Sequence, residues 1–259
     1  MFKRSLILLL AAVMFFSPTA VSFADAASYS FTALETGAIA IQKPADNDLR
    51  VFITKEDHQA LYTLTEDARL PLQFGNGDYE INVYEKINGR FKLIDQQALN
   101  LQLEDPKAVY LNATQNVDFN EDMAAVRKAR ELTRDLATQA EKIDAIHSYV
   151  IENIVYDYQK ARTVKGNYVP SVEGTFEIAS GICYDYASLM AGMLRSIGVP
   201  TKVAVGYVGT VYHAWNEIYL EETGEWITVD ATQDAIYSKY GLPVSLSKTS
   251  DMYQVAVTY

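Results

Sequence analysis

Hydrophobic and polar positions alternate in short runs over the first part of the chain. The runs at residues 49–53, 60–64, 79–84 and 91–94 are rich in β-branched and aromatic residues, and several alternate in polarity. Alternation with a period of two is typical of strands that bury one face. From residue 28 to about residue 119, the pattern therefore predicts short strands separated by turns.

The strongest local signal among these runs is the dipeptide Asn88-Gly89. Asn-Gly favours a two-residue type I′ turn, because both central residues of that turn adopt positive φ. We therefore expect a hairpin that runs out along residues 79–87 and returns along residues 90–95. Together with the other runs, it predicts a small antiparallel β-sandwich that resembles an immunoglobulin-like module.

After the strand-like region, apolar residues recur at spacings of three and four, which is typical of amphipathic helices. A first helix is predicted over residues 121–137. A second begins at a capping box of Thr138 and Glu141, whose hydroxyl and carboxylate each satisfy a backbone N–H. A third begins at Cys183 and ends at Gly198-Val199-Pro200, because glycine followed by proline stops a helix.

Residues 156–174, between the second and third helices, are polar and contain glycine and proline. We interpret them as a long loop that leads to Cys183, and long loops in compact domains are often functional. Strand-like runs at residues 201–208, 213–220 and 226–229 follow the third helix. They predict an antiparallel sheet packed on the helices, so the expected fold class is α+β with a small all-β sandwich domain in front.

The beginning of the chain has the three parts of an export signal. Residues 1–26 combine a basic start, an apolar run and the small-residue pattern Ala24-Asp25-Ala26. The apolar run is short for a membrane span, so we expect cleavage, with an uncleaved anchor as the alternative. The predicted organisation is a signal peptide at 1–26, a sandwich at 27–119 and a second domain at 120–259, in a secreted or extracytoplasmic protein of the cell surface or cell wall.

The composition fits a folded, acidic protein. Hydrophobic residues make up 49% of the chain, and 22 basic residues stand against 33 acidic ones. Without Lys3, Arg4 and Asp25 of the export signal, 20 basic and 32 acidic residues remain, a net charge of about −12. Because no Lys/Arg cluster interrupts this balance, we expect neither nucleic-acid nor anionic-lipid binding. No segment after residue 26 is apolar enough to cross a bilayer, so we expect no stable membrane insertion after cleavage. The charge favours cationic partners such as lysine-bearing peptides, or simply keeps an exported protein soluble.

Cys183 is the only cysteine of the chain, so it has no partner for an intramolecular disulfide. It lies two residues after Gly181, which lets the backbone approach closely and turn into the predicted third helix. At the start of that helix, backbone N–H groups and the helix dipole favour a thiolate. Its own backbone N–H is placed to donate to a developing oxyanion. A buried, inert cysteine that fills the core is the alternative.

A thiol nucleophile needs a base and a group that orients the base, and His213 and Asp230 supply those residue types. If residues 221–224 form a four-residue hairpin loop, Asp230 lies opposite Trp215, two residues from His213 and on the same face of the sheet. A hairpin shifted by one residue would put the imidazole and the carboxylate on opposite faces. The predicted catalytic residues are therefore Cys183, His213 and Asp230.

Each of these residues also has a simpler interpretation. His213 can be a hydrogen-bonded core histidine, and Asp230 a carboxylate at a strand end or turn. A metal site built from Cys183, His213 and Asp230 has suitable ligand types but lacks the close ligand pairs of most zinc motifs, so we expect no metal and no cofactor. We interpret His58 as a surface residue and His147 as a structural or surface residue.

Three segments in this order and spacing resemble the core of the transglutaminase-like superfamily, whose members are similar in fold to papain-type thiol enzymes and carry a Cys, His, Asp triad. The matching segments are Gly181-Ile182-Cys183 with Tyr186-Ala187, His213-Ala214-Trp215-Asn216-Glu217, and Trp226-Ile227-Thr228-Val229-Asp230-Ala231-Thr232. The likeness extends back over residues 143–158. It covers roughly residues 120–235 and does not reach the sandwich.

The resemblance implies a papain-like, transglutaminase-like catalytic domain at 120–259. It further implies attack of the Cys183 thiolate on a carboxamide, a thioester, and transfer of the acyl group to an amine or to water. The expected partners are protein or peptide substrates, including cell-wall peptides. A catalytically silent scaffold or binding module at the cell surface is the alternative.

The sequence departs from papain-type enzymes at one position. Many of them have a glutamine upstream of the cysteine as a second oxyanion donor, and this chain has none between Gln159 and Cys183. Asn167 and Tyr168 are the candidates to replace it.

Overall fold

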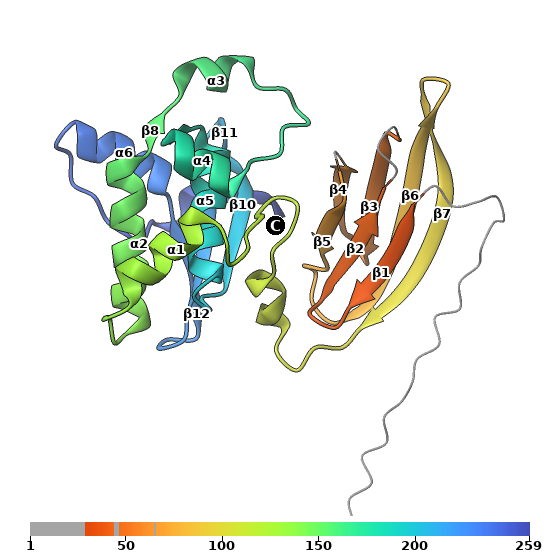
Figure 1. The fold of residues 1–259 in the computed structure, drawn as a ribbon, viewed down its shortest axis with the longest axis horizontal. Helices are drawn as coiled ribbons and strands as arrows, with labels where there is room; N and C mark the ends of the chain where they lie inside the picture. Colours follow the sequence, from red (N-terminus) through yellow and green to blue (C-terminus); the bar gives the residue numbers. More distant parts are fainter. Residues whose placement is uncertain (1–28, 44–46, 65) are drawn as a thin grey trace, which may run out of the picture.

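The computed structural model describes residues 29–43, 47–64 and 66–259. The predicted signal peptide at residues 1–26 lies outside the described residues. Within them, no helix is both long enough and apolar enough to cross a membrane. Figure 1 shows a β-sheet part on one side, a mixed helical and sheet part on the other, and the C-terminus between them.

The N-terminal part is a sandwich of two antiparallel sheets. One sheet has the order β1-β2-β5, with β1 (Ser30–Leu34), β2 (Ala38–Gln42) and β5 (Ala68–Pro71). The other has the order β4-β3-β6-β7, with β4 (His58–Leu64), β3 (Leu49–Lys55), β6 (Gly77–Ile87) and β7 (Arg90–Leu101). Alternate residues such as Ile39, Val51 and Ile81 are fully buried in one shared core, as period-two alternation requires.

The Asn88-Gly89 hairpin is confirmed. Ile87 pairs with Arg90, and both turn residues have positive φ, 51° at Asn88 and 78° at Gly89. This is the type I′ geometry that the dipeptide favours. The strands are longer than predicted. They pair from Gly77, which faces Leu101, to Ile87, which faces Arg90 at the turn.

The second part contains a central buried helix, α5, with the other helices around it. Their bounds are η1 (Pro106–Leu111), α1 (Ala124–Thr133), α2 (Gln139–Asn153), α3 (Tyr158–Thr163), α4 (Val172–Ile178), α5 (Cys183–Arg195), α6 (Ala231–Lys239) and η2 (Ser250–Met252). The predicted capping box of Thr138 and Glu141 is present at the start of α2. Along α5, every residue from Asp185 to Arg195 is buried. This helix therefore forms the centre of the core, which is why its apolar positions are not confined to one stripe.

An antiparallel sheet packs against α5, as predicted. Its strand order is β12-β11-β10-β13, with β12 (Glu225–Val229), β11 (Val211–Leu220), β10 (Thr201–Val208) and β13 (Tyr253–Thr258). The first three correspond to the predicted runs. The edge strand β13 and the helix α6 were not predicted from the sequence.

Two predicted boundaries are wrong. The first helix covers Ala124–Thr133 instead of residues 121–137, because the Asn120 side chain accepts the Asp122 N–H and holds residues 120–123 in a turn. The predicted loop at 156–174 contains α3 and the start of α4. Asp157 and Ser171 cap these short helices with their side chains, and such local caps are weak signals in a sequence without apolar periodicity.

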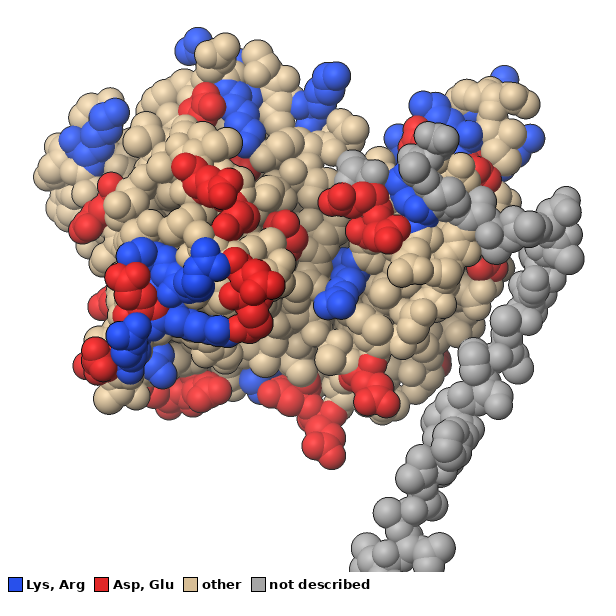
Figure 2. All heavy atoms as spheres, viewed as in Figure 1, with Lys and Arg blue, Asp and Glu red and all other residues tan. Residues whose placement is uncertain are grey.

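The two parts of the molecule are joined by side chains as well as by the connecting segment. The buried Arg195 guanidinium donates to the carbonyl oxygens of Asn112, Thr201 and Tyr259, each at 2.8 Å. Burial lowers the pKa of Arg195 to about 9. The Tyr259 ring packs edge-on against Tyr62 of the sandwich. On the face shown in Figure 2, basic and acidic side chains are mixed and no large area of one sign stands out.

Candidate active site

Cys183 lies at the first position of α5, as predicted. Its side chain is half-buried, so the sulfur is neither sealed in the core nor freely exposed. The preceding residue, Ile182, adopts the extended conformation of an N-cap. The sulfur therefore lies beside the unpaired N–H groups at the N-terminus of a 13-residue helix, where negative charge is favoured.

The approach of the chain to Cys183 is fixed by a short parallel pairing. In β8 (Val155–Tyr156) and β9 (Ser180–Gly181), Tyr156 pairs with Gly181. A Cβ atom built on Gly181 would lie 2.5 Å from the Cβ of Asp185. Only glycine allows this approach, which agrees with the prediction that Gly181 is needed for the close turn.

Asp185 is a fully buried carboxylate that holds this turn together. It accepts hydrogen bonds from the Ile182 N–H at 2.8 Å, from Lys160 Nζ at 2.7 Å and from the Tyr168 hydroxyl at 2.5 Å. The Tyr168 O–H is therefore engaged with Asp185. The assignment of Asn167 or Tyr168 as a second oxyanion donor stays a prediction.

The β11–β12 hairpin brings His213 and Asp230 together. Leu220 pairs with Glu225, and Asn216 pairs with Val229, which is the register expected from a four-residue loop. His213 Nε2 lies 2.9 Å from Asp230 Oδ2. Asp230 is also the N-cap of α6, where its Oδ1 accepts the Gln233 N–H at 2.9 Å. The carboxylate therefore contacts the imidazole while one of its oxygens is fixed by the helix.

This arrangement shifts the pKa values of both His213 and Asp230. Burial disfavours a charged His213, but its hydrogen bonds with Asp230 and Cys183 outweigh burial and raise its pKa to about 10. Burial likewise raises the pKa of Asp230, but the hydrogen bonds from His213, Gln233 and Tyr253 lower it below its usual range overall. The pair is thus an imidazolium next to a carboxylate at neutral pH.

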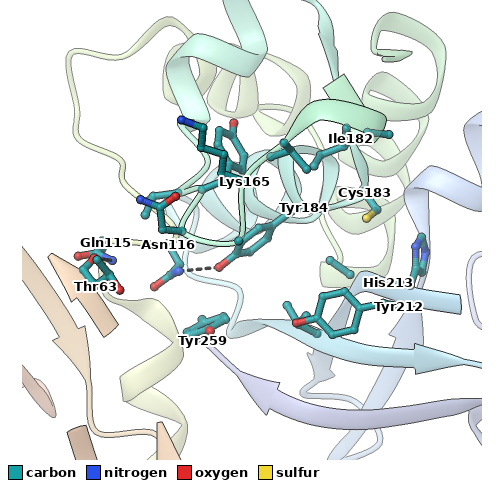
Figure 3. Close-up of a pocket in the computed structure, with 18 of the residues that line it drawn as sticks. Thr63, Gln115, Asn116, Lys165, Ile182, Cys183, Tyr184, Tyr212, His213 and Tyr259 are labelled. Carbon is teal, nitrogen blue, oxygen red and sulfur yellow. Dashed lines mark hydrogen bonds between the residues drawn. The ribbon is translucent and has the colours of Figure 1, made fainter. Parts of the chain in front are cut away.

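The structure brings the three predicted residues together. His213 Nε2 contacts Asp230 Oδ2 at 2.9 Å, and the neighbouring Cys183 thiol helps to raise the pKa of the same imidazole. Figure 3 shows the Cys183 sulfur and the His213 ring on the same side of the pocket. Such an arrangement can keep a proton on the imidazole beside the sulfur and hold the ring in one orientation.

Tyr253 is a further residue of the site that sequence reasoning missed. Its hydroxyl donates to Asp230 Oδ2 at 3.0 Å. Burial and the neighbouring carboxylate raise its pKa, so it stays a donor at neutral pH. Tyr253 begins β13, an edge strand with no motif, and only the pairing of β13 with β10 shows that it reaches Asp230.

A pocket of about 440 Å³ opens beside the thiol. Cys183, His213 and Tyr212 line one end, and Thr63 and Gln115 line the other (Figure 3). This volume lies in the range of pockets that bind small molecules or short chain segments.

The other two histidines lie away from this pocket. His58 is exposed on the sandwich, as expected. His147 is buried, and its Nε2 lies 2.9 Å from Oδ2 of the buried Asp234, whose Oδ1 pairs with Lys248. These contacts agree with the interpretation of His147 as a structural residue. Within the described part of the chain, no group of three His, Cys, Asp or Glu side chains is arranged to hold a metal ion.

Comparison with known proteins locates the site within a family. Residues 126–231 match the Transglutaminase-like superfamily. This match includes Cys183, His213 and Asp230, and it lies within the interval of roughly 120–235 expected from the sequence motifs.

Two curated proteins match parts of the chain. The uncharacterized protein YebA of Bacillus subtilis is 27% identical over 124 residues, which is 40% of this chain and 17% of that protein. A protein-glutamine gamma-glutamyltransferase of Pseudomonas aeruginosa is 37% identical over 71 residues, 22% of this chain and 10% of that protein. The chain thus spans less than a fifth of the length of these relatives.

Solved structures also match the chain, at lower sequence identity. A candidate cysteine protease from Cytophaga hutchinsonii has a TM-score of 0.44 at 15% identity, covering 86% of this chain and 82% of that chain. The periplasmic domain of TgpA from Pseudomonas aeruginosa, bound to ethylmercury, has a TM-score of 0.39 at 18% identity. It covers 76% of this chain and 92% of that one.

Proposed function

Since residues 126–231 are a domain of the transglutaminase-like superfamily, we propose that the protein is an exported thiol enzyme acting on carboxamide bonds of proteins or peptides. Cys183 is the nucleophile, His213 the acid and base, and Asp230 the group that orients the imidazole. The observation that carries the proposal is the 2.9 Å contact of His213 with Asp230, in a pocket that His213 lines together with Cys183.

In the first half of the reaction, the Cys183 sulfur attacks the carbonyl carbon of the carboxamide as a thiolate, while His213 already carries the proton as an imidazolium. The backbone N–H of Cys183 donates to the developing oxyanion, supported by the N-terminal end of α5. His213 then returns the proton to the leaving nitrogen. The C–N bond breaks, ammonia or an amine leaves, and the acyl group stays on Cys183 as a thioester.

In the second half, an amine or a water molecule attacks the thioester. His213 takes a proton from this nucleophile, and the thiolate leaves, which restores the enzyme. An amine gives a crosslink and water gives hydrolysis. The choice depends on how well the second nucleophile is held and how completely water is excluded.

A glutamine side chain is the first carboxamide to test. The Pseudomonas relative whose name specifies protein-glutamine transfer is 37% identical over 71 residues, which supports this choice. The predicted export signal supports an extracytoplasmic protein or a cell-wall peptide as substrate.

The test is incubation of the protein with a glutamine-containing peptide, with and without a primary amine, followed by mass spectrometry. Deamidation of the side chain, incorporation of the amine and cleavage of the backbone each give a different mass. The matched control is Cys183→Ala, which removes the nucleophile. We expect one of the three products with the unaltered protein and none with the variant. The proposal is wrong if product forms equally fast with Cys183→Ala, or if no carboxamide peptide acylates Cys183.

A further inference from the structure

We propose that the substrate binds as an extended peptide that adds a strand to the edge of the sandwich at β4, in the pocket that leads to Cys183. The inference rests on the proposed function, because the bound peptide is the substrate of the same thiol. It assigns the sandwich, which lies outside the matched family domain, a role in substrate binding.

The pocket connects the thiol with the sandwich. Cys183 and His213 line one end, and Leu61 and Thr63 of β4 line the other. Figure 3 shows Cys183 and His213 on the opposite side of the pocket from Thr63. In Figure 1, the segment after α3 arches toward the sandwich, and Lys165, which lines the pocket, belongs to this segment. A chain that leaves the thiol along the pocket therefore reaches β4.

The strand β4 is an edge of its sheet, since it pairs only with β3 among the described strands. Lys55 and His58 close a two-residue hairpin, so the backbone groups of His58, Ala60 and Tyr62 face β3 and those of the intervening residues face outward. The outward direction is visible at Thr63, whose carbonyl oxygen accepts the Gln115 Nε2–H at 3.2 Å.

Leu61 has the same outward orientation as Thr63. Its backbone N–H and C=O have no hydrogen-bond partner among the described residues, and the residue as a whole is 43% exposed. An exposed pair of backbone groups on an edge strand is the attachment point for an added strand. Because Leu61 also lines the pocket, the added strand would lie within the pocket.

Two side-chain amides at this end of the pocket have unused acceptors. Gln115 Oε1 and Asn116 Oδ1 are buried and have no hydrogen-bond partner among the described residues. Both residues line the pocket, and Asn116 is 5% exposed. Each oxygen is covered by neighbouring atoms, so a peptide N–H would reach it only after the amide turns and gives up its present donor bond, from Gln115 Nε2 to the Thr63 carbonyl oxygen or from Asn116 Nδ2 to the Tyr184 hydroxyl. Such a bond would remove the cost of an unsatisfied buried acceptor.

The lining also indicates the charge of the peptide. The described residues that line the pocket include no Asp or Glu, and Lys165 is a lining residue. The remaining lining of the pocket is rich in tyrosine, including Tyr156, Tyr184 and Tyr212. This lining fits an uncharged or acidic peptide and gives a cationic one no carboxylate to pair with.

The test uses a peptide that carries its own thiol reagent and needs no turnover. The probe is iodoacetyl-Gly-Ala-Val-Ala-Gly-amide, and its rate of alkylation of Cys183 is divided by the rate for iodoacetamide. The ratio of the two rates is also measured with free N-acetylcysteine as the thiol. Dividing the protein ratio by this one corrects for the intrinsic reactivity of the two reagents. If the peptide forms two backbone hydrogen bonds in the pocket, the corrected ratio should be about 10. A peptide without such contacts gives a ratio of about 1.

Peptides methylated at alternate nitrogens identify the contact. One analogue carries N-methyl groups at its odd positions and the other at its even positions. Because an added strand donates from alternate residues, we expect one analogue to lose the rate advantage and the other to keep it. Equal rates for both analogues, or no advantage for the unmodified peptide, would overturn the proposal.

A pair of matched variants tests β4 itself. Leu61→Pro removes an outward N–H inside the pocket, and Gln59→Pro removes an outward N–H on the same strand outside the pocket lining. The peptide advantage should disappear only in Leu61→Pro, with thermal melting as the check on folding. If Leu61→Pro does not fold, the methylated peptides decide the question in the unaltered protein.

The iodoacetamide rate alone reports on the proposed function. An ordinary rate at neutral pH, with the peptide advantage intact, would count against thiol catalysis and leave the binding groove standing. A fast iodoacetamide rate without a peptide advantage would reject the groove and leave the catalytic assignment standing.

Discussion

The Tyr253 hydroxyl donates to the same Asp230 oxygen that contacts His213. Asp230 Oδ2 therefore has two partners, Tyr253 at 3.0 Å and His213 Nε2 at 2.9 Å, while Oδ1 is held by the Gln233 N–H. With both oxygens engaged, the carboxylate has one orientation. This makes Tyr253 a positioning residue for the proposed catalytic base.

Replacing Tyr253 by phenylalanine removes this hydrogen bond and keeps the ring. We expect kcat/KM to fall about 10- to 100-fold, as for loss of a hydrogen bond to a charged group. Because Tyr253 helps to lower the pKa of Asp230, the acid limb of the pH–rate profile should move to higher pH. Tyr240→Phe, at an exposed tyrosine, is the control and should match the unaltered protein. An unshifted acid limb with a full rate would contradict the positioning role.

The protonation of His213 can be followed by NMR of its ring nitrogens. We expect loss of the proton near pH 10 in the unaltered protein, and at lower pH in Cys183→Ala and in Asp230→Asn, because each variant removes a partner of the imidazolium. Titration near 6.5 in the unaltered protein would show that the raised pKa is wrong.

The same shift predicts how stability depends on pH. The folded-state pKa of His213 is raised from 6.5 to about 10, so its contribution to stability is complete below pH 6.5 and is lost as the pH rises through about 10. Urea unfolding of the unaltered protein and of His213→Gln, compared at several pH values, measures this contribution. The difference in the free energy of unfolding should shrink steadily over this interval.

Removing the base should abolish turnover without unfolding the protein. His213→Ala is expected to lower kcat by about 10²- to 10⁴-fold, the usual contribution of general acid–base catalysis. His58→Ala, at an exposed histidine of the sandwich, should retain full activity. Far-UV circular dichroism and a melting curve check that His213→Ala is folded. A full rate in the folded variant would reject His213 as the base.

Gly181 should not tolerate a side chain. In Gly181→Ala the new Cβ would lie 2.5 Å from Asp185 Cβ and 2.8 Å from its Oδ2, so the carboxylate must move and release the Ile182 N–H. We expect a loss of about 1–3 kcal/mol in the free energy of unfolding, as for overpacking, together with lower activity. Gly166→Ala is the matched control for the free energy of unfolding, since a Cβ there meets nothing within 4 Å. Equal urea midpoints for the two variants would show that the close approach at Gly181 is not required.

Local patterns predicted much of the fold because they depend on neighbouring residues alone. The Asn88-Gly89 turn and the Thr138 capping box are examples, since turn type and cap depend on a few adjacent residues. The relation between His213 and Asp230 was also predictable, because a short hairpin fixes its own register. Helix ends were less accurate, as at Thr133, because they depend on single side chains and turns.

The groups that hold the site in place come from remote parts of the chain. Tyr253 reaches Asp230 only because β13 pairs with β10, and Lys160 reaches Asp185 only because α3 packs near the start of α5. His147 and Asp234 meet across α2 and α6, 87 positions apart. No sequence pattern records such contacts, because the residues share no local periodicity.

By itself, the sequence determined the residue types of the chemistry, the helix that begins at Cys183 and the hairpin that aligns His213 with Asp230, since each follows from periodicity or from a short connection. The tertiary structure decided that the thiol meets the imidazole, that Tyr253 fixes the carboxylate and that the edge of β4 lies at the far end of the same pocket. These relations arise when remote segments pack around one core, and packing depends on the whole chain at once.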